Sequence, residues 1–338
     1  MSKKEQKIIT KSKNKNLNPF VITLLILLVI YSFTFIFAIY FGILTSLKTP
    51  QEYMYGDPFA GNPPNILGFP NISLNKKFAS IDGTVYNIFN NYKYVLDSFK
   101  FIPDSVSYFT MFGTQVEHVG KQVGILDYLF NTLMYCGICP LLTVLCSSVS
   151  GFLCCKYKYK YSGFLYTLLL ITMTIPVVGS QPATLTMLQK AGLYDTYLSM
   201  IVQNMHFGGI HFFVFYAFFQ GLSDTYIEAA EIDGASQFST LIKIVIPLAW
   251  KTMLTVYIIM FVALWNTYEA PMLYYPTKPT LAYGIYWMAN STTNTNVITQ
   301  SAPVKIAGCM TLCIPTLIIF LCLKDVMMGN LTLGGLKE

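Results

Sequence analysis

The chain has 338 residues, of which 54% are hydrophobic and 11% are charged, and its mean hydropathy is +0.51. Soluble domains contain about 45–50% apolar residues in short runs, so the composition excludes an ordinary soluble domain and indicates a membrane protein with several spans. The net charge of +6 is carried by lysines that mostly flank the apolar runs. That placement argues against nucleic-acid binding, which needs basic and aromatic residues together on one exposed face.

The chain begins with a lysine-rich segment, residues 1–18, which we expect to be a cytoplasmic tail. The apolar run that follows is too long for the core of a signal peptide and lacks a small-residue cleavage site. Residues 19–45 are therefore predicted to form a retained first transmembrane helix. Residues 46–122 are rich in proline, glycine, asparagine and aromatic residues, and they are predicted to form a partly structured external loop.

Five more apolar segments lie within residues 123–325, and each is close to the roughly 20 residues that a transmembrane helix needs. They fall at about residues 126–154, 164–185 (interrupted by Pro176), 197–222, 244–268 and 304–323. Lys156, Lys158 and Lys160 indicate a cytoplasmic loop, because lysine is enriched on that side of the membrane. The sequence therefore predicts an all-α polytopic membrane protein of six transmembrane helices. Both termini, including a tail at residues 326–338, are expected in the cytoplasm.

A charged segment separates the fourth and fifth predicted spans. Glu228, Glu231 and Asp233 lie within six residues, and carboxylates are costly in hydrocarbon. The segment must therefore lie in water, and its place in the order of spans puts it on the cytoplasmic side.

The same segment carries the start and stop signals of two short helices. Thr225 and Glu228 have the spacing of a capping box, which predicts that the first helix begins at Thr225. Gly234 predicts where that helix ends, and Ser236 is the predicted cap of a second helix that runs towards Pro247. We therefore expect a compact projection of two helices on the membrane face.

The spacing of residues in this projection resembles a known loop. Glu228-Ala229-Ala230 is followed after three residues by Gly234, and after nine more by Ile244-Val245-Ile246-Pro247. This pattern resembles the EAA loop of permeases in binding-protein-dependent ABC importers, and the run Asp233-Gly234-Ala235-Ser236 is similar to the sugar-uptake branch. Lys251 stands where many sugar permeases have a second proline, a difference that concerns helix bending.

The resemblance implies the type I ABC importer permease fold, as in the smaller, six-span permease of maltose-type transporters. Residues 224–243 would then contain a coupling helix that docks in a cleft of a cytoplasmic ATPase subunit. The Ala-Ala pair and the glycine would give this helix a smooth face for close approach. The residues that the resemblance assigns to the contact are Glu228, Ala229, Ala230, Asp233, Gly234 and Pro247.

The resemblance also implies partners and a location. The chain would work in a bacterial plasma membrane with a second permease subunit, two ATPase subunits and an extracellular solute-binding protein, importing a sugar such as an oligosaccharide. The external stretch that contains residues 289–296 would touch the binding protein. A glycine-rich tail with Gly334, Gly335 and Lys337 would touch the ATPase subunits. Residues 99–123 look like an insertion relative to a typical member, with no role assigned.

Trp265, Asn266, Tyr268 and Glu269 combine aromatic and polar groups at the end of the fifth predicted span. Sugars bind by stacking on aromatic faces and by hydrogen bonds to their hydroxyl groups, so this mixture suits a substrate pathway. An interfacial belt is the alternative, because Trp and Tyr gather at headgroup depth in membrane proteins generally. The residues alone leave both interpretations open.

The sequence lacks the groups that a self-powered transporter or an enzyme would need. It has no Gly-x-x-x-x-Gly-Lys-Ser/Thr loop for nucleotide phosphates, so ATP would be hydrolysed on separate subunits. The three histidines are too scattered for a metal site, no cofactor is expected, and the eight cysteines are expected to be packing residues in or beside apolar spans.

Three alternatives stay open at this point. An ion-coupled secondary transporter should carry carboxylates near the membrane midplane, and no acidic residue lies well inside a predicted span. A membrane-embedded enzyme should carry a cluster of Asp, Glu or His at a span end, which the sequence lacks. An ABC importer permease for a solute other than a sugar shares most of the features above.

Overall fold

The computed structural model describes residues 19–55, 68–70, 87, 89–99, 107–111, 114–118, 123–157, 159–175, 179–205, 207–290 and 300–331. The chain divides into two compact units, Met1–Asn91 and Tyr92–Glu338, and each is described by itself. Several segments named above lie outside the described residues. They are the tail at residues 1–18, residues 291–296 of the external stretch, and the end of the chain with Gly334, Gly335 and Lys337.

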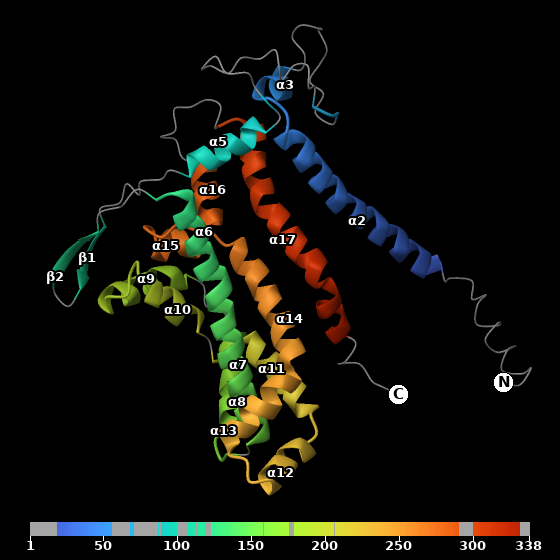
Figure 1. The fold of residues 1–338 in the computed structure, drawn as a ribbon, viewed down its shortest axis with the longest axis vertical. Coiled ribbons are helices and arrows are strands. Elements are labelled where there is room, and N and C mark those ends of the chain that lie inside the picture. Colours follow the sequence, from blue (N-terminus) through green and yellow to red (C-terminus); the bar gives the residue numbers. More distant parts are fainter. Residues whose placement is uncertain are drawn as a thin grey trace, which may run out of the picture. The chain divides into compact units, whose positions relative to one another are not determined.

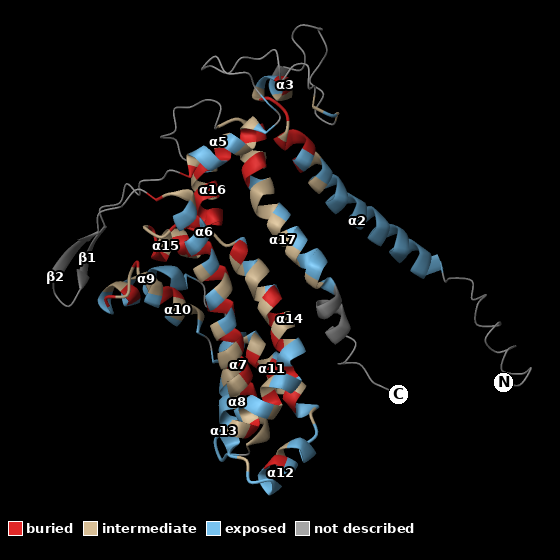
Figure 2. Cartoon of the chain, viewed as in Figure 1, coloured by how far each residue is buried: buried red, intermediate tan, exposed pale blue. Residues whose placement is uncertain are grey.

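The first unit contains α2 (Pro19–Ser46) and α3 (Pro50–Tyr55). α2 covers the predicted first span, and most of its side chains are exposed (Figure 2). The last carbonyl groups of a helix have no partner within the helix. Here the buried Asn91 donates from Nδ2 to the carbonyl oxygens of Ser46 (2.7 Å) and Lys48 (2.8 Å), so it stabilises the end of α2.

The second unit is helical apart from one β-hairpin (Figure 1). The hairpin, β1 (Ser107–Met111) with β2 (Thr114–His118), is antiparallel and lies in the segment interpreted as an insertion. The all-α prediction is confirmed for the rest of the described unit. The helices are α5 (Asn90–Ser98, which starts in the first unit), α6 (Ile125–Leu133), α7 (Cys139–Lys156), α8 (Ser162–Thr174), α9 (Ser180–Lys190), α10 (Tyr197–Asn204), α11 (Ile210–Gln220), α12 (Thr225–Ile232), α13 (Gln237–Thr240), α14 (Ile246–Trp265), α15 (Glu269–Tyr274), α16 (Leu281–Asn290) and α17 (Ala302–Leu331).

Two of these helices are continued by wider π turns. The π segment η2 (Met134–Ile138) joins α6 to α7, and η3 (Leu241–Val245) joins α13 to α14. Pro247, the second residue of α14, lies inside the continuous helix beside η3, where the wider turn accommodates a residue without an N–H. The second helix of the charged segment is therefore continuous with the fifth span.

Four helices among the described residues are long and apolar enough to cross a membrane. They are α2 and the continuous helices Ile125–Lys156, Gln237–Asn266 and Ala302–Lys324, which match the first, second, fifth and sixth predicted spans. The number of six spans stays a prediction, because the third and fourth predicted spans are not single helices in the structure.

Proline and glycine explain the two interruptions. α8 ends at Thr174, because Ile175 precedes a proline and is extended (φ −79°, ψ 114°), as steric contact with the proline ring favours. The predicted span at residues 197–222 is instead α10 followed by α11, with a break that ends at Gly209 (φ 86°). A continuous helix at residues 197–222 was therefore a wrong expectation, whereas the interruption expected at Pro176 matches the end of α8 at Thr174.

Two clusters of buried side chains hold the second unit together, and Figure 2 marks the buried residues along the helices. One cluster joins α6, α9, α10, α15, α16 and α17, and includes Tyr128, Tyr275 and Met288. The other joins α7, α11 and α14, and includes Phe152, Phe219 and Ala249. The rings of Phe152 and Phe219 meet edge to face, with their centres 5.4 Å apart. α8 has no buried residue and most of its apolar side chains are exposed, although the Tyr166 ring contacts the rings of Phe213 and Tyr216 in α11.

α7 and α11 lie close together at Gly151. A Cβ atom on Gly151 would lie 3.1 Å from Phe215 Cβ and 3.1 Å from the backbone nitrogen of Tyr216. Small residues at such positions let helix backbones approach each other within membranes. The backbone of α11 cannot move aside as a flexible side chain would, so we expect this crossing to require glycine.

Gly151→Ala should destabilise the protein relative to a matched change in α8. At Gly163 an added Cβ meets no atom within 4 Å, so Gly163→Ala should gain helix stability of up to about 1 kcal/mol. Gly151→Ala should gain similar helix propensity, but its methyl group overpacks the crossing of α7 and α11, which costs roughly 1–3 kcal/mol. Thermal unfolding of both variants in detergent measures the difference, and equal midpoints would contradict the close approach.

Candidate functional site

The charged segment forms a projection at one end of the second unit (Figure 1). α12 begins at Thr225, as predicted, but the capping box does not form. Asp224 occupies the cap position and makes no side-chain cap hydrogen bond. Its carboxylate instead forms an ion pair with Lys156 (Oδ1 to Nζ, 2.6 Å). The predicted box would have Thr225 at the cap, whereas Thr225 is the first residue of the helix and Asp224, paired with Lys156, stands at the cap.

The turn between α12 and α13 follows the prediction closely. Gly234 has φ 74°, and its N–H donates to the carbonyl oxygen of Glu231 (3.0 Å). The N–H of Ala235 donates to the carbonyl oxygen of Ala230 (2.9 Å), which completes a Schellman motif. The hydroxyl of Ser236 then accepts from the N–H of Ser239 (3.3 Å), so Ser236 caps α13.

The predicted contact residues do not all face outwards. Glu228, Ala229, Asp233, Gly234 and Pro247 are exposed. In contrast, Ala230 is 4% exposed. The expectation that both alanines form a smooth outer face is therefore wrong, because the side chain of the second alanine packs inwards.

The projection also exposes apolar side chains that the sequence interpretation passed over. Ile232 is 86% exposed and Phe238 is 70% exposed, one on each side of the glycine turn, and Tyr226 is 49% exposed. Exposed apolar groups beside carboxylates are typical of a surface that contacts another protein. Isoleucine and phenylalanine inside a charged segment were the available sequence signal.

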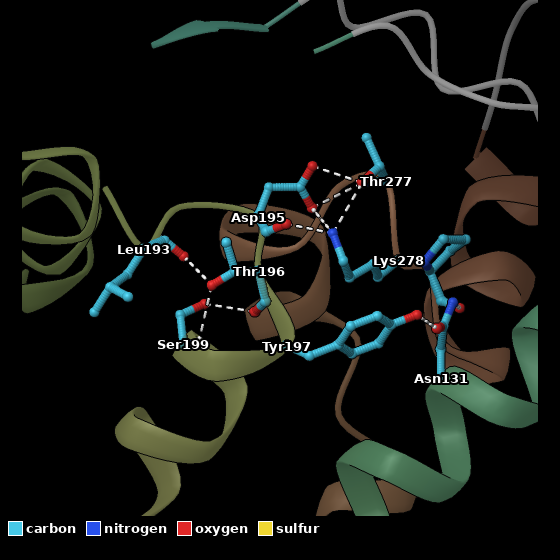
Figure 3. Close-up of polar contacts among 9 residues, drawn as sticks. Asn131, Leu193, Asp195, Thr196, Tyr197, Ser199, Thr277 and Lys278 are labelled. Carbon is cyan, nitrogen blue, oxygen red and sulfur yellow. Dashed lines mark hydrogen bonds and ion pairs between the residues drawn. The ribbon is translucent and has the colours of Figure 1, made fainter. Parts of the chain in front are cut away.

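A polar cluster lies away from the projection, where the loop before α10 meets the segment between α15 and α16 (Figure 3). Asp195 is 1% exposed and has φ 57°, and it is the one non-glycine residue with positive φ in the described chain. Thr277 donates to its carboxylate from Oγ1 (2.6 Å) and from the backbone nitrogen (3.3 Å). Lys278 Nζ forms an ion pair with Oδ1 (3.4 Å) and also donates to the Asp195 carbonyl oxygen.

The cluster continues to the start of the second span. The ammonium group of Lys278 lies 5.3 Å from the centre of the Tyr197 ring. Tyr197 donates its hydroxyl hydrogen to Asn131 Oδ1 (2.7 Å), and Asn131 Nδ2 donates to the Pro279 carbonyl oxygen (3.1 Å). This network ties α6, α10 and the α15–α16 connection together, and the sequence interpretation did not find it.

The four candidates for a substrate pathway are placed differently from one another. Trp265 is buried, stacks on Phe261 at 5.7 Å and donates Nε1–H to the Leu312 carbonyl oxygen of α17 (3.1 Å). Asn266 and Glu269 are exposed. Tyr268 is partly buried and stacks on Tyr286 of α16, with ring centres 4.1 Å apart and planes 11° apart. Trp265 thus packs between two helices, and the other three residues lie at the surface.

The described residues hold no group of three or more His, Cys, Asp or Glu side chains that could bind a metal ion. The eight cysteines are free, and Cys136 and Cys139 are buried in the core.

Comparison with known proteins agrees with this architecture. A putative ABC transporter permease protein of Caldicellulosiruptor sp. is 28% identical over 162 residues, which are 47% of this chain and 59% of that protein. The arabinooligosaccharides transport system permease protein AraQ of Halalkalibacterium halodurans is 24% identical over 209 residues, 61% of this chain and 72% of that protein.

A solved structure supports the fold. A chain of a bacterial ABC transporter involved in the import of the acidic polysaccharide alginate superposes with a TM-score of 0.59 at 18% identity, covering 90% of this chain and 95% of that one. Residues 144–331, more than half of the chain and including the whole projection, match one family. The chain belongs to the family of binding-protein-dependent transport system inner membrane components.

Proposed function

We propose that the protein is a permease subunit of an ATP-driven ABC importer for a sugar, such as an oligosaccharide. The observation that carries the proposal is the exposed projection of α12, the Gly234 turn and α13, which lies inside the matched family region. The names of the relatives above support transport by an ABC system, and AraQ supports an oligosaccharide. The chain would have no catalytic role of its own.

The projection would dock in a cleft of an ATPase subunit. Its apolar groups, Ile232 and Phe238, would fill the cleft, while Glu228 and Asp233 would meet polar or basic groups at the rim. Exposed Ala229 and Gly234 would allow close approach. Because α13 continues into α14, movement of the ATPase subunits would pass directly to a long membrane helix.

The remaining parts of the assembly follow from the same proposal. A second permease subunit would complete the pathway, an extracellular binding protein would deliver the sugar, and two ATPase subunits would drive the cycle. Both termini would be cytoplasmic in a bacterial plasma membrane, and the tail with Gly334, Gly335 and Lys337 would touch the ATPase subunits. Residues 46–122 would form the elaborated external loop.

Purification of the protein with its membrane partners tests the proposal. We expect an ATPase subunit to co-purify, and we expect ATP hydrolysis in proteoliposomes to rise when the binding protein and a sugar are added. The sugar probes are maltotriose, raffinose, xylotriose and arabinotriose, with glycerol 3-phosphate as a non-sugar probe. Uptake driven by an ion gradient in the absence of any ATPase subunit would instead favour a secondary transporter.

Tyr268→Ala should weaken the apparent affinity for the sugar if the surface residues after α14 line the pathway. The Tyr268–Tyr286 stack offers a flat aromatic face beside exposed Asn266 and Glu269. Loss of an aromatic contact of about 0.5–1.5 kcal/mol predicts a roughly 2- to 10-fold higher KM for uptake. Tyr268→Phe keeps the ring and should change KM little.

Trp265→Phe is the contrasting variant, because the indole N–H of Trp265 donates a hydrogen bond to α17 and does not face the proposed pathway. Losing that hydrogen bond should cost about 0.5–1.5 kcal/mol of stability with an unchanged KM. If Tyr268→Ala alters only expression and Trp265→Phe alters KM, the pathway proposed here is in the wrong place.

A further inference from the structure

One lysine fastens the last turn of α7 to the beginning of α12. Lys156 Nζ donates to the Leu222 carbonyl oxygen (2.5 Å) and to Asp224 Oδ1 (2.6 Å). Leu222 follows the end of α11, and Asp224 is the cap residue of α12. A single ammonium group therefore joins three helices at the base of the projection.

The two charged partners differ in their exposure to water. The side chain of Lys156 is 8% exposed, whereas that of Asp224 is 69% exposed. A charged group that is largely removed from water needs polar partners, and the end of α11 supplies one where the helix dipole is negative. The bundle therefore fixes the lysine, and the aspartate brings the start of α12 to it.

Tyr157, the residue after Lys156, also packs in the bundle. The Tyr157 ring packs edge-on against Phe152 (5.7 Å) in the core of the bundle. Burial, together with the nearby charge of Glu231, raises the pKa of Tyr157. Tyr157 therefore packs in the bundle next to Lys156, and the charge of Glu231 in α12 acts on its hydroxyl group.

The projection is connected to the membrane helices by routes of different strength. Its C-terminal side leads through η3 into α14 along the chain itself. Its N-terminal side reaches α7 through non-covalent contacts, which are the Lys156 bridge and the packing of Ile227 against the buried cluster of α7, α11 and α14. A displaced projection would carry α14 with it in any case, but α7 would follow only as far as these contacts hold.

We propose that Lys156 is a positioning residue for energy coupling, which makes α7 follow α12 when the ATPase subunits move the projection. This inference rests on the proposed function. It adds a mechanical role to a lysine that otherwise serves only to mark the cytoplasmic side of the membrane.

The test uses the assembled importer in nanodiscs with Lys156→Met, Lys156→Arg or Lys160→Met. Lys160 is exposed in the segment that follows α7, so its variant is the matched control. The movement of α7 is followed at the native thiol of Cys154, which is partly buried two residues before Lys156 and donates to the Ser162 carbonyl oxygen (3.3 Å). Its labelling rate with N-ethylmaleimide, by peptide mass spectrometry, is compared between the nucleotide-free and vanadate-trapped states.

We expect the labelling rate of wild type and Lys160→Met to differ between the two states. Lys156→Met should keep its ATPase subunits, and its melting temperature should stay within a few degrees of wild type. The difference in Cys154 labelling rate between its two states should be smaller than in wild type by roughly fivefold or more, which is the lower range of coupling between sites. Lys156→Arg keeps the charge and several N–H donors, so it should restore much of the difference. A role confined to stability would not show this pattern.

Several results would overturn the inference. One is a ratio of the two Cys154 labelling rates that is the same in Lys156→Met as in wild type, and another is a ratio of one in wild type itself. A third is loss of the ATPase subunits from Lys156→Met alone, which would make the lysine a docking residue. If Lys156→Met does not fold, Asp224→Asn is the variant to measure, because asparagine still suits a helix cap and the Lys156–Leu222 hydrogen bond remains. An unchanged ratio of labelling rates in Asp224→Asn would count against the bridge. Failure of wild type to bind any ATPase subunit would instead refute the proposed function itself.

Discussion

Replacing Gly234 with tryptophan should leave the protein in the membrane and uncouple ATP hydrolysis from sugar uptake. Gly234 has φ 74°, a conformation that costs other L-residues about 1–2 kcal/mol. A Cβ there meets no atom within 4 Å, so the harm comes from the backbone and from bulk facing the partner, rather than from a clash inside the chain. We expect uptake per ATP to fall by roughly fivefold or more, measured in proteoliposomes.

Two further variants separate backbone strain from bulk. Gly234→Asn should keep most of the uptake, because asparagine tolerates the left-handed conformation better than other non-glycine residues. Gly221→Ala is the matched control, since Gly221 is exposed near the same face with φ −78°. Wild-type uptake in Gly234→Trp would show that the turn does not approach a partner closely.

The features that the sequence predicted correctly are local ones. Gly234 and Ser236 act on residues within five positions of themselves, so their types alone indicate a helix end and a helix cap. The long spans were predictable for a similar reason, because length and apolarity decide membrane insertion.

The features that the sequence missed depend on distant partners or on backbone breaks. The predicted capping box did not form because Asp224, not Thr225, occupies the cap position, and the Asp224 carboxylate pairs with Lys156, 68 residues away. Ala230 turns inwards because α12 packs on the bundle, which no pattern of eight residues reveals. The fourth span was predicted as a single helix because hydropathy is insensitive to the glycine pair at residues 208–209, whereas the proline in the third span was visible in the sequence as an interruption.

The Asp195 cluster is the clearest case of a site hidden from the sequence. Asp195 and Thr277 lie 82 residues apart, and each stands in a short connection that reads as an ordinary turn. Only the fold brings them together with Lys278, next to the start of the second span. A buried carboxylate at positive φ is costly, so its neighbours must stabilise it.

Lys278→Met should therefore destabilise the protein more than Asp195→Asn does. The methionine variant removes the ammonium group from a carboxylate whose side chain is 0% exposed, and breaking a buried pair from one side costs about 3–5 kcal/mol. Asp195→Asn keeps a residue that tolerates φ 57°, and Lys278, 16% exposed, keeps the backbone carbonyl and some access to water. Its cost should be nearer that of one hydrogen bond to a charged group, about 1.5–3 kcal/mol.

The double variant gives the decisive comparison. Removing both charges takes away the buried unpaired carboxylate, so Asp195→Asn combined with Lys278→Met should be more stable than Lys278→Met alone. Thermal unfolding of the four proteins in one detergent measures the order, with Lys190→Met as the control, because Lys190 is exposed at the end of α9. A double variant as unstable as the sum of the single changes would mean that the two side chains act independently. The cluster would then not be a paired network that holds α10 to the α15–α16 connection.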